Sequence, residues 1–359
     1  MNNITRIQQA LVRQDLDAIL ITDEKNQRYA TGFAFTDGAV VVGREKAWLI
    51  TDSRYVEAAE KTVPDFVTVQ QFDRSRRLLS ILKEDLAEAK VQRLGAEEQK
   101  LSHARWAALE KALERQLLPA GGLMMGLRAS KSQEEIDSMI RAQRISEKAL
   151  EEVLHIIKPG MTEKEVMAEL VYHMLRNGSE GNSFDPIVVT GTNTSMPHGV
   201  PGDTVIRDGD FITMDFGSLK NGYCSDMTRT VAVGHATEEM KKVYYTVLEA
   251  QLAGIAAARS GIPGKHIDQA ARDVIEKAGY GPYFGHGFGH SLGLDIHEPP
   301  MAGPRGETLM EVNDLCSAEP GIYIPGKFGV RIEDVMIIRP EGAEVITKAP
   351  KMELIVLNN

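Results

Sequence analysis

The chain has 359 residues, more than one hydrophobic core usually supports, so we expect two domains. Its net charge of −10 argues against a nucleic-acid partner, which calls for a basic surface. A cytoplasmic protein without membrane partners is favoured, because two cysteines make no disulfide framework, the first residues lack a signal-peptide core, and no apolar run approaches the ~20 residues that span a bilayer.

Residues 1–122 alternate short apolar runs with amphipathic stretches, the pattern of an α/β domain with a modest sheet. The predicted strands are 18–21, 39–42, 48–50 and 67–69, and the predicted helices are 24–30, 53–61, 74–89 and 102–113. We find no cluster of chemically reactive side chains here. We therefore interpret this part as a structural, dimerising or substrate-gating domain.

The turn-forming sequence at 119–122 predicts a linker between two helical patterns. It separates the predicted domains 1–122 and 128–359. The second domain begins with two helices that each carry a capping box, in which a hydroxyl and a glutamate three residues later satisfy the first backbone N–H groups.

The second domain continues with strands, two further helices and a final group of strands. The predicted helices are 132–158, 162–177, 237–259 and 264–278, and the predicted strands are 186–190, 211–216, 224–233, 315–318 and 330–338. Helices first and mostly antiparallel strands later predict an α+β domain whose helices pack on one face of the sheet.

Asp215 and Asp226 belong to strand-like runs that turn-forming residues connect. A four-residue loop would place Asp215 opposite Asp226. A two-residue turn at Asn221–Gly222 would place Asp226 opposite Gly217. Either loop puts both carboxylates on one face of the hairpin, since side chains alternate with period two. Like charges on one face repel, and a cation between them removes that penalty, whereas the alternative of solvated surface aspartates fits their apolar neighbours less well.

Further candidates follow near the C-terminus. Arg331 and Glu333 share one face of a predicted strand, where Arg331 can orient a ligand carboxylate or that of a neighbour, although an ordinary strand ion pair is the alternative. His286 and His290 lie among glycines, which let the backbone approach a ligand closely. Glu319 precedes a Pro-Gly turn that tips its carboxylate out of the strand. Two more histidines are candidates, His198 and His297.

The segments around the four acidic candidates and His290 occur in an order that resembles the pita-bread metallopeptidases: methionine aminopeptidase, aminopeptidase P, prolidase and the metal-free creatinase. The resemblance covers 128–359 and implies a curved, mostly antiparallel sheet. Residues 1–122 resemble the smaller N-terminal domain of creatinase, which methionine aminopeptidases usually lack. The presence of that domain, together with the sequences at 293–300 and 319–323, favours the proline-directed members of the family.

The resemblance also implies a role for each candidate. The metal ligands would be Asp215, Asp226, His290, Glu319 and Glu333, with Asp226 and Glu333 bridging two ions. The catalytic and substrate-contacting residues would be His198, His286, His297, Arg331 and Glu319. Phe288 and Ser291 depart from residues that are common in the family, and we expect them to lie in the pocket wall and to influence substrate preference.

Carboxylate oxygens with one imidazole form a donor set that suits two divalent ions; Mn²⁺ fits, and Co²⁺, Zn²⁺ or Fe²⁺ could substitute. The implied function is a homodimeric, dinuclear-metal exopeptidase that hydrolyses the bond between an N-terminal residue and proline in short peptides. An Xaa-Pro dipeptidase (prolidase) is favoured over an aminopeptidase P acting on longer peptides, because the N-terminal domain is compact. A silent binding protein and a creatinase-like C–N hydrolase are alternatives that the intact ligand set disfavours.

Overall fold

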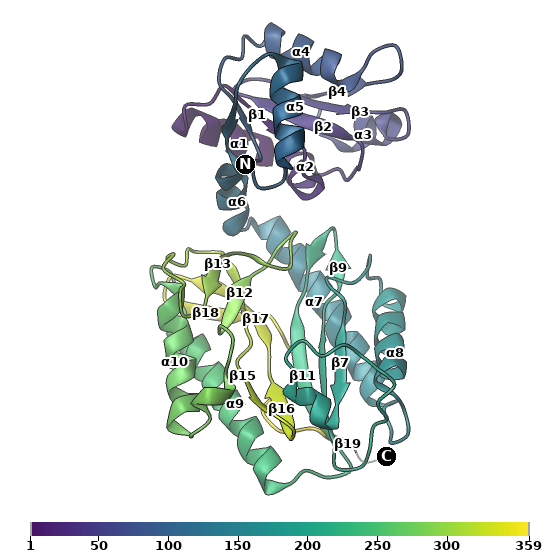
Figure 1. The fold of residues 1–359 in the computed structure, drawn as a ribbon, viewed down its shortest axis with the longest axis vertical. Helices are drawn as coiled ribbons and strands as arrows, with labels where there is room; N and C mark the ends of the chain where they lie inside the picture. The colour runs from purple at the N-terminus through teal and green to yellow at the C-terminus, as the bar shows by residue number, and fades with distance from the viewer. Residues whose placement is uncertain (1, 358–359) are drawn as a thin grey trace. The chain divides into compact units, whose positions relative to one another are not determined.

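The computed structural model describes residues 2–357, which form two compact units (Figure 1). One unit ends at Arg128 and the other begins at Ala129. Each unit has its own buried apolar clusters. Across residues 2–357, no helix combines the length and the apolar character that crossing a membrane needs.

The first unit is built on a mixed six-stranded sheet in the order β4-β3-β2-β1-β5-β6. Its strands are β1 (Ala18–Ile21), β2 (Gly38–Gly43), β3 (Ala47–Thr51), β4 (Val67–Gln71), β5 (Leu94–Ala96) and β6 (Leu117–Pro119). Its helices are α1 (Asn3–Arg13), α2 (Glu24–Thr31), α3 (Val56–Thr62), α4 (Leu78–Glu88), α5 (His103–Leu113) and α6 (Gly121–Ala129). The predicted α/β pattern is confirmed, and all four predicted strands are present.

Two helices of this unit begin later than predicted, because aspartate side chains hold turns in front of them. The Asp52 carboxylate accepts the backbone N–H of Arg54, and α3 begins only at Val56. The Asp73 carboxylate accepts the N–H groups of Ser75 and Arg76 in front of α4. Such local side-chain bonds compete with helical bonding.

The predicted linker at 119–122 is wrong. Pro119 is the last residue of β6, and α6 begins two residues later at Gly121. The Glu98 carboxylate holds this turn by accepting the N–H groups of Ala120 and Gly121 at 3.0 and 2.7 Å. Proline and glycine therefore form a tight strand-to-helix turn inside the first unit, and the unit boundary lies at the end of α6.

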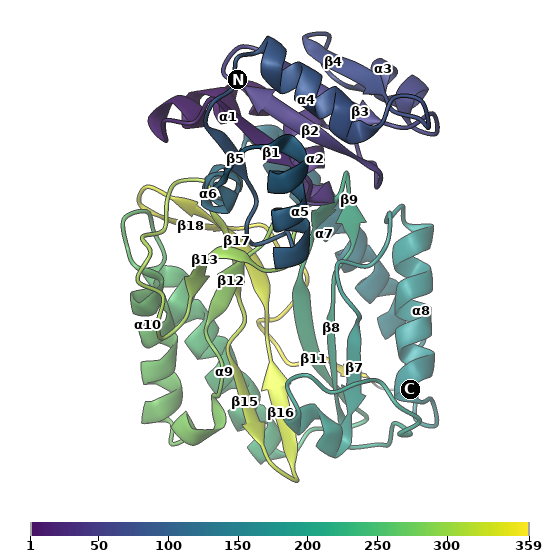
Figure 2. The same ribbon diagram turned by 45° about the horizontal axis from the view of Figure 1, so that its top comes forward.

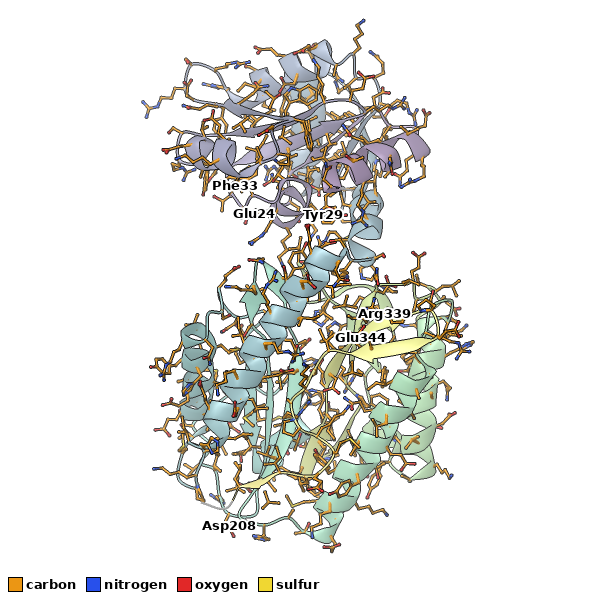
Figure 3. The ribbon with its side chains drawn as sticks, turned by 180° about the vertical axis from the view of Figure 1, so that it is seen from behind. Glu24, Tyr29, Phe33, Asp208, Arg339 and Glu344 are labelled. Carbon is orange, nitrogen blue, oxygen red and sulfur yellow. The ribbon has the colours of Figure 1, made fainter. Side chains whose placement is uncertain are left out.

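The second unit places its four long helices on one face of antiparallel strands, as predicted (Figures 1 and 2; Figure 3 shows the helical face). The helices are α7 (Gln133–Leu154), α8 (Glu163–Arg176), α9 (Glu238–Ala257) and α10 (Gly264–Lys277), with the short 3₁₀ segments η1 (Gly191–Ser195) and η2 (Gly281–Tyr283). Both predicted capping boxes are present, Ser132 with Glu135 and Thr162 with Glu165.

The strands of this unit form two main sheets and two hairpins, in the orders β19-β11-β8-β7, β13-β12-β14-β17-β18, β10-β9 and β15-β16. Their bounds are β7 (Ile187–Thr190), β8 (Phe211–Phe216), β9 (Leu219–Lys220), β10 (Tyr223–Cys224), β11 (Met227–Val233), β12 (Gly289–Ser291), β13 (Glu298–Ala302), β14 (Leu315–Ala318), β15 (Gly321–Ile324), β16 (Phe328–Arg331), β17 (Asp334–Arg339), β18 (Gly342–Val345) and β19 (Val356–Leu357). Among the pairings of these strands, only β11 with β19 is parallel. Figures 1 and 2 show α8 beside the β7–β8–β11 half and α10 beside the β12–β13 half.

Candidate metal centre

A cavity of about 410 Å³ opens within the second unit. Every residue that sequence analysis assigned to metal binding, catalysis or substrate contact lines it: His198, Asp215, Asp226, His286, His290, His297, Glu319, Arg331 and Glu333. These residues come from both halves of the unit, and they span more than a hundred positions of the chain. The structure therefore brings together all the predicted site residues.

The hairpin that carries Asp215 and Asp226 has a two-residue turn. Lys220 pairs with Tyr223, and both Asn221 and Gly222 have positive φ, the conformation that tight hairpin turns require. The two-residue alternative is confirmed and the four-residue loop is wrong. The loop length is even, so both carboxylates face the same cavity, as expected.

The predicted strand 224–233 is interrupted at Ser225 and Asp226, between β10 and β11. Gly217 makes this break possible, because a Cβ there would lie 1.9 Å from the Ser225 carbonyl oxygen. Ser218 donates its N–H to the Ser225 hydroxyl at 2.8 Å, which replaces a regular ladder bond. Asp226 thus leaves the strand where the chain bends, and it is buried.

Both candidate glutamates also sit where strands stop. Glu319 follows the last residue of β14, and Glu333 lies in the short break between β16 and β17. Ala318 pairs with Asp334 across β14 and β17, and this register continued by one residue places Glu319 opposite Glu333. The Glu333 N–H donates to the Thr228 carbonyl of β11 at 3.1 Å, which connects this break to the aspartate hairpin.

His290 presents a lone pair to acidic neighbours. Its Nδ1 lies 3.1 Å from the Ser291 carbonyl oxygen, which can only accept, so the ring proton is on Nδ1. Nε2 then faces Glu319 Oε1 at 3.3 Å and Asp226 Oδ2 at 3.6 Å. Two ionised carboxylates and an imidazole lone pair that face one another repel, unless a proton or a cation lies among them.

Donor atoms of Asp226, His290 and Glu333 all lie within 4.8 Å of one another. Burial, reinforced by the Glu333 and Asp215 charges, raises the pKa of Asp226 well above its ordinary value. Burial likewise raises the pKa of Glu319 and, together with the Glu319 and Asp215 charges, that of Glu333. Burial lowers the pKa of His290 and keeps the imidazole neutral. Divalent cations would relieve this crowding of carboxylates.

Two buried oxygens decide whether cations fit. Asp215 Oδ2 accepts Arg331 Nη2 at 2.6 Å, and Glu333 Oε2 accepts the Thr228 hydroxyl at 2.7 Å. Asp215 Oδ1 and Glu333 Oε1 are buried and have no hydrogen-bond partner among the described residues. One anchored oxygen and one open oxygen on a carboxylate is the arrangement of a metal ligand held by an outer partner. The residues present therefore fit divalent metal ions.

Arg331 is held toward Asp215 by a chain of hydrogen bonds. Its Nη1 donates to the Tyr323 hydroxyl at 2.8 Å, and that hydroxyl lies 2.9 Å from His286 Nε2. His286 Nδ1 donates to the Gly287 carbonyl at 2.8 Å, so Nε2 accepts the Tyr323 proton. Burial lowers the pKa of His286, which agrees with a neutral ring.

Sequence analysis assigned no role to Thr228 or Tyr323, which position the acidic residues. Thr228 is buried in β11 and bonds both Glu333 and Arg331. Tyr323 does end the segment 319–323 that carried the family resemblance, and this was the available signal. Thr228 gave no comparable signal, because its partners lie about a hundred residues away.

The two remaining histidines stand at the open part of the cavity. His198 follows η1, His297 precedes β13, and both side chains are exposed while lining the cavity. The His297 and His290 ring centres are 4.2 Å apart. Both rings can therefore reach a molecule that enters from solvent.

The prediction that Phe288 and Ser291 lie in the pocket wall is wrong. Both are fully buried, and neither lines the cavity. The Phe288 ring lies against Gly254 of α9, where an added Cβ would come within 2.3 Å of it. Gly287 and Gly289 on either side of it line the cavity, whereas the Phe288 side chain turns into the core.

Comparisons with known proteins agree with this architecture. Residues 137–340 match the profile described as metallopeptidase family M24, and residues 3–130 match the creatinase/prolidase N-terminal domain. An Xaa-Pro dipeptidase from Pyrococcus furiosus is 35% identical over 339 residues, 94% of each chain. Among solved structures, an Xaa-Pro dipeptidase from Bacillus anthracis is 41% identical with a TM-score of 0.94 over 99% of both chains. An X-Pro aminopeptidase from Thermotoga maritima is 34% identical, with a TM-score of 0.92 over 97% of this chain and 99% of that one.

Proposed function

The chain belongs to metallopeptidase family M24, and from this premise we propose that it is an exopeptidase that hydrolyses the bond between an N-terminal residue and proline. The family and the fold predicted from the ordered site segments are confirmed. The observation that carries the proposal is one cavity in which four carboxylates converge on a neutral imidazole while buried oxygens stay open. Relatives of nearly full length are named Xaa-Pro dipeptidase or aminopeptidase, which supports the proline specificity.

Five residues of this cavity would hold two divalent ions, for which we propose Mn²⁺. Asp226 and Glu333 would bridge the ions, Asp215 would complete one site, and His290 with Glu319 would complete the other. When bound, such ions supply a water of lowered pKa and positive charge for the oxygen that becomes negative during attack. Four oxygen-donor residues and a single imidazole agree with Mn²⁺, and Co²⁺, Zn²⁺ or Fe²⁺ suit the same donors.

The chain's own side chains would move the protons and orient the peptide. Glu319 would take a proton from the attacking water and return it to the leaving imino nitrogen. His198 and His297, exposed at the cavity, would donate to the scissile carbonyl and stabilise the tetrahedral intermediate. Arg331, which Tyr323 anchors, would keep Asp215 aimed at the ions. His286 would contact the residue after the scissile bond.

Within this activity we favour the dipeptidase, and an aminopeptidase acting on longer peptides is the second candidate. The Bacillus anthracis dipeptidase and the Thermotoga maritima aminopeptidase both align with nearly the whole chain. This similarity to both supports retaining the aminopeptidase as an alternative. We further propose that the protein acts in the cytoplasm as a homodimer, with residues 1–128 as the N-terminal domain and 129–359 as the catalytic domain. A sedimentation measurement tests the dimer.

A matched panel of peptides tests the activity and its length preference. Purified protein with added Mn²⁺ would be assayed for release of the N-terminal residue from Ala-Pro, Met-Pro and Leu-Pro, from the same peptides extended by one residue, and from Ala-Ala. We expect cleavage of the Xaa-Pro dipeptides and no cleavage of Ala-Ala. Efficient cleavage of the extended peptides would favour the aminopeptidase, and no cleavage of any proline peptide would contradict the proposed function.

A further inference from the structure

A buried glutamine on α9 connects the two strand ends that carry the candidate glutamates. Gln251 has no exposed surface. Its Nε2 donates to the Ala318 carbonyl at 3.0 Å and to the Ile332 carbonyl at 3.3 Å. Ala318 immediately precedes Glu319, and Ile332 immediately precedes Glu333. A single amide group therefore binds the backbone directly before both glutamates.

The same glutamine belongs to a charged network around Asp334, the residue after Glu333. Asp334 Oδ1 accepts Arg229 Nη2 at 2.8 Å, and Asp334 Oδ2 accepts the Lys351 ammonium. The Lys351 ammonium also donates to Gln251 Oε1. Arg229 Nη1 donates to the Glu333 carbonyl at 2.5 Å. The backbone of Glu333 is thus held on both sides, through Ile332 and through its own carbonyl.

This network is largely buried, and its members come from distant parts of the chain. The side chains of Arg229 and Asp334 are 2% and 1% exposed, and that of Lys351 is 13% exposed. Lys351 lies beyond residues 137–340, the part that the M24 profile matches. Buried ion pairs add little stability compared with a well-packed apolar core, so stability alone does not account for three charged side chains here.

The bonds from Gln251 control the orientation of the peptide planes that precede Glu319 and Glu333. Glu319 and Glu333 stand just beyond regular strands, where the N–H of each donates to a single backbone carbonyl, that of Phe288 or Thr228. Gln251 bonds the carbonyl oxygen at the other end of the same two peptide planes. The direction in which each carboxylate points follows from the peptide plane before it, and Gln251 holds both of those planes. Groups that orient metal ligands in this indirect way typically change metal affinity about 10- to 100-fold when they are removed.

We propose that Gln251 and Lys351 are positioning residues that set the spacing of Glu319 and Glu333 and thereby the affinity of the centre for divalent ions. The inference rests on the proposed metal centre. By this proposal, α9 and the C-terminal segment around Lys351 contribute to the metal site, although the side chains of Gln251 and Lys351 do not line the cavity.

The test compares two buried glutamines. Gln251→Leu removes the amide that bonds both carbonyls. The control Gln143→Leu changes a fully buried glutamine on α7 whose amide atoms have no hydrogen-bond partner among residues 2–357. Mn²⁺ affinity of the full-length, chelator-stripped proteins would be measured by calorimetric titration, with thermal unfolding of the metal-free forms alongside. We expect Gln251→Leu to raise the Kd for Mn²⁺ by about 10- to 100-fold, and Gln143→Leu to leave it unchanged.

Activity supplies a second readout. We expect kcat of Gln251→Leu to recover as Mn²⁺ is raised to saturation, because the donors remain and only their spacing is relaxed. A loss of thermal stability in both glutamine variants, with wild-type Mn²⁺ affinity in both, would show that Gln251 only packs the core and would overturn the inference.

The lysine gives an independent variant in case Gln251→Leu does not fold. Lys351→Met should weaken Mn²⁺ binding by about tenfold, and Lys351→Arg should restore most of it because a cation returns beside Asp334. Lys348→Met, at an exposed lysine of the same segment, is the control and should bind as the wild type does. Equal Mn²⁺ affinity of Lys351→Met and Lys348→Met overturns the inference while the proposed function stands; a wild-type protein that binds no Mn²⁺ overturns both.

Discussion

Each unit of the molecule contains a buried glutamate, and the two glutamates differ in how their oxygens are hydrogen-bonded. In the first unit, Glu97 has no exposed surface, and both of its oxygens are used. Its Oε2 accepts the N–H groups of Thr22 and Asp23 at 2.7 and 2.9 Å, and its Oε1 accepts the Asn26 amide at 2.6 Å. In the second unit, Glu333 is equally buried, yet only one of its oxygens has a donor.

This difference separates a carboxylate that supports the fold from one whose free oxygen suits a metal ligand. Burial raises the pKa of both Glu97 and Glu333, so the direction of the pKa shift does not distinguish them. The inventory of hydrogen bonds does, because an unsatisfied buried oxygen is costly unless something occupies it. In the second unit the open oxygens of Glu333 and Asp215 face a common cavity.

The largest expected effect comes from removing the metal ions that the carboxylates of the second unit would hold. Stripping the metal with a chelator, or the substitution Asp226→Ala, should reduce kcat/KM by about 10³-fold, since about 4 kcal/mol of charge stabilisation is lost at 1.36 kcal/mol per tenfold. Added Mn²⁺ should restore the stripped wild type but not the variant. Asp208→Ala, at an exposed aspartate that Figure 3 labels, is the control. Full activity after complete metal removal would show that the carboxylates of the second unit do not serve a catalytic metal centre.

The next effect concerns a side chain that contacts substrate without holding an ion. His297→Gln should lower kcat by about 10²-fold, the scale of one lost donor to a developing oxyanion, while Mn²⁺ stoichiometry stays that of the wild type. His266→Gln, at an exposed histidine of α10, should change neither quantity. Loss of bound metal in His297→Gln would assign the ring to the ions and not to the substrate.

A smaller effect is expected from the satisfied carboxylate of the first unit. Glu97→Leu removes the acceptor of the Thr22 and Asp23 N–H groups and of the Asn26 amide, and it should lower the free energy of unfolding by about 3 kcal/mol. The folded fraction should keep wild-type Mn²⁺ affinity and kcat. Urea unfolding measures the free energy of unfolding. Assays at low temperature measure kcat and Mn²⁺ affinity of the folded protein. The surface substitution Glu60→Gln should be neutral, and a Glu97→Leu variant that lost Mn²⁺ would blur the distinction between the two units.

The smallest effect comes from comparing, within the second unit, a buried carboxylate outside the cavity with those that line it. Asp314 is buried with one oxygen lacking a partner among the described residues, but it does not line the cavity, and burial raises its pKa to about 6. Because its folded pKa exceeds the unfolded value of 3.8, stability falls as pH rises between these values and stays lowered above them. Asp314→Asn removes this penalty and should therefore raise the free energy of unfolding at pH 7.5.

The pH dependence checks that sign. The stability gained by Asp314→Asn should shrink as the pH falls toward 4, where the folded wild-type carboxyl is already protonated. Thermal unfolding across this range, with Asp203→Asn at an exposed aspartate as control, measures it. A gain that is equal at pH 4 and pH 7.5 would show that ionisation of Asp314 is not its cause.

Local pattern accounts for much of the architecture. The bounds of β8 and β14 follow from largely apolar runs, which are followed by Gly217 and by Glu319 respectively. The two capping boxes mark their helices because capping is settled within four residues. Alternation along the hairpin put Asp215 and Asp226 on one face before any tertiary contact was known. The order of the acidic segments and of His290 was enough to predict the family.

Other features depended on residues far apart in sequence. Proline and glycine at 119–122 mark a turn, and only the Glu98 carboxylate decides that this turn closes a strand against a helix. The break before β11 needs Gly217 against Ser225, and the support of Glu333 needs Gln251 and the C-terminal Lys351. Periodicity and caps are local properties of the backbone and can be read from neighbouring residues. The partners of a buried hydrogen bond, by contrast, are chosen by packing across the whole unit, and the tertiary structure alone decided which oxygens here were satisfied and which were left open for a ligand.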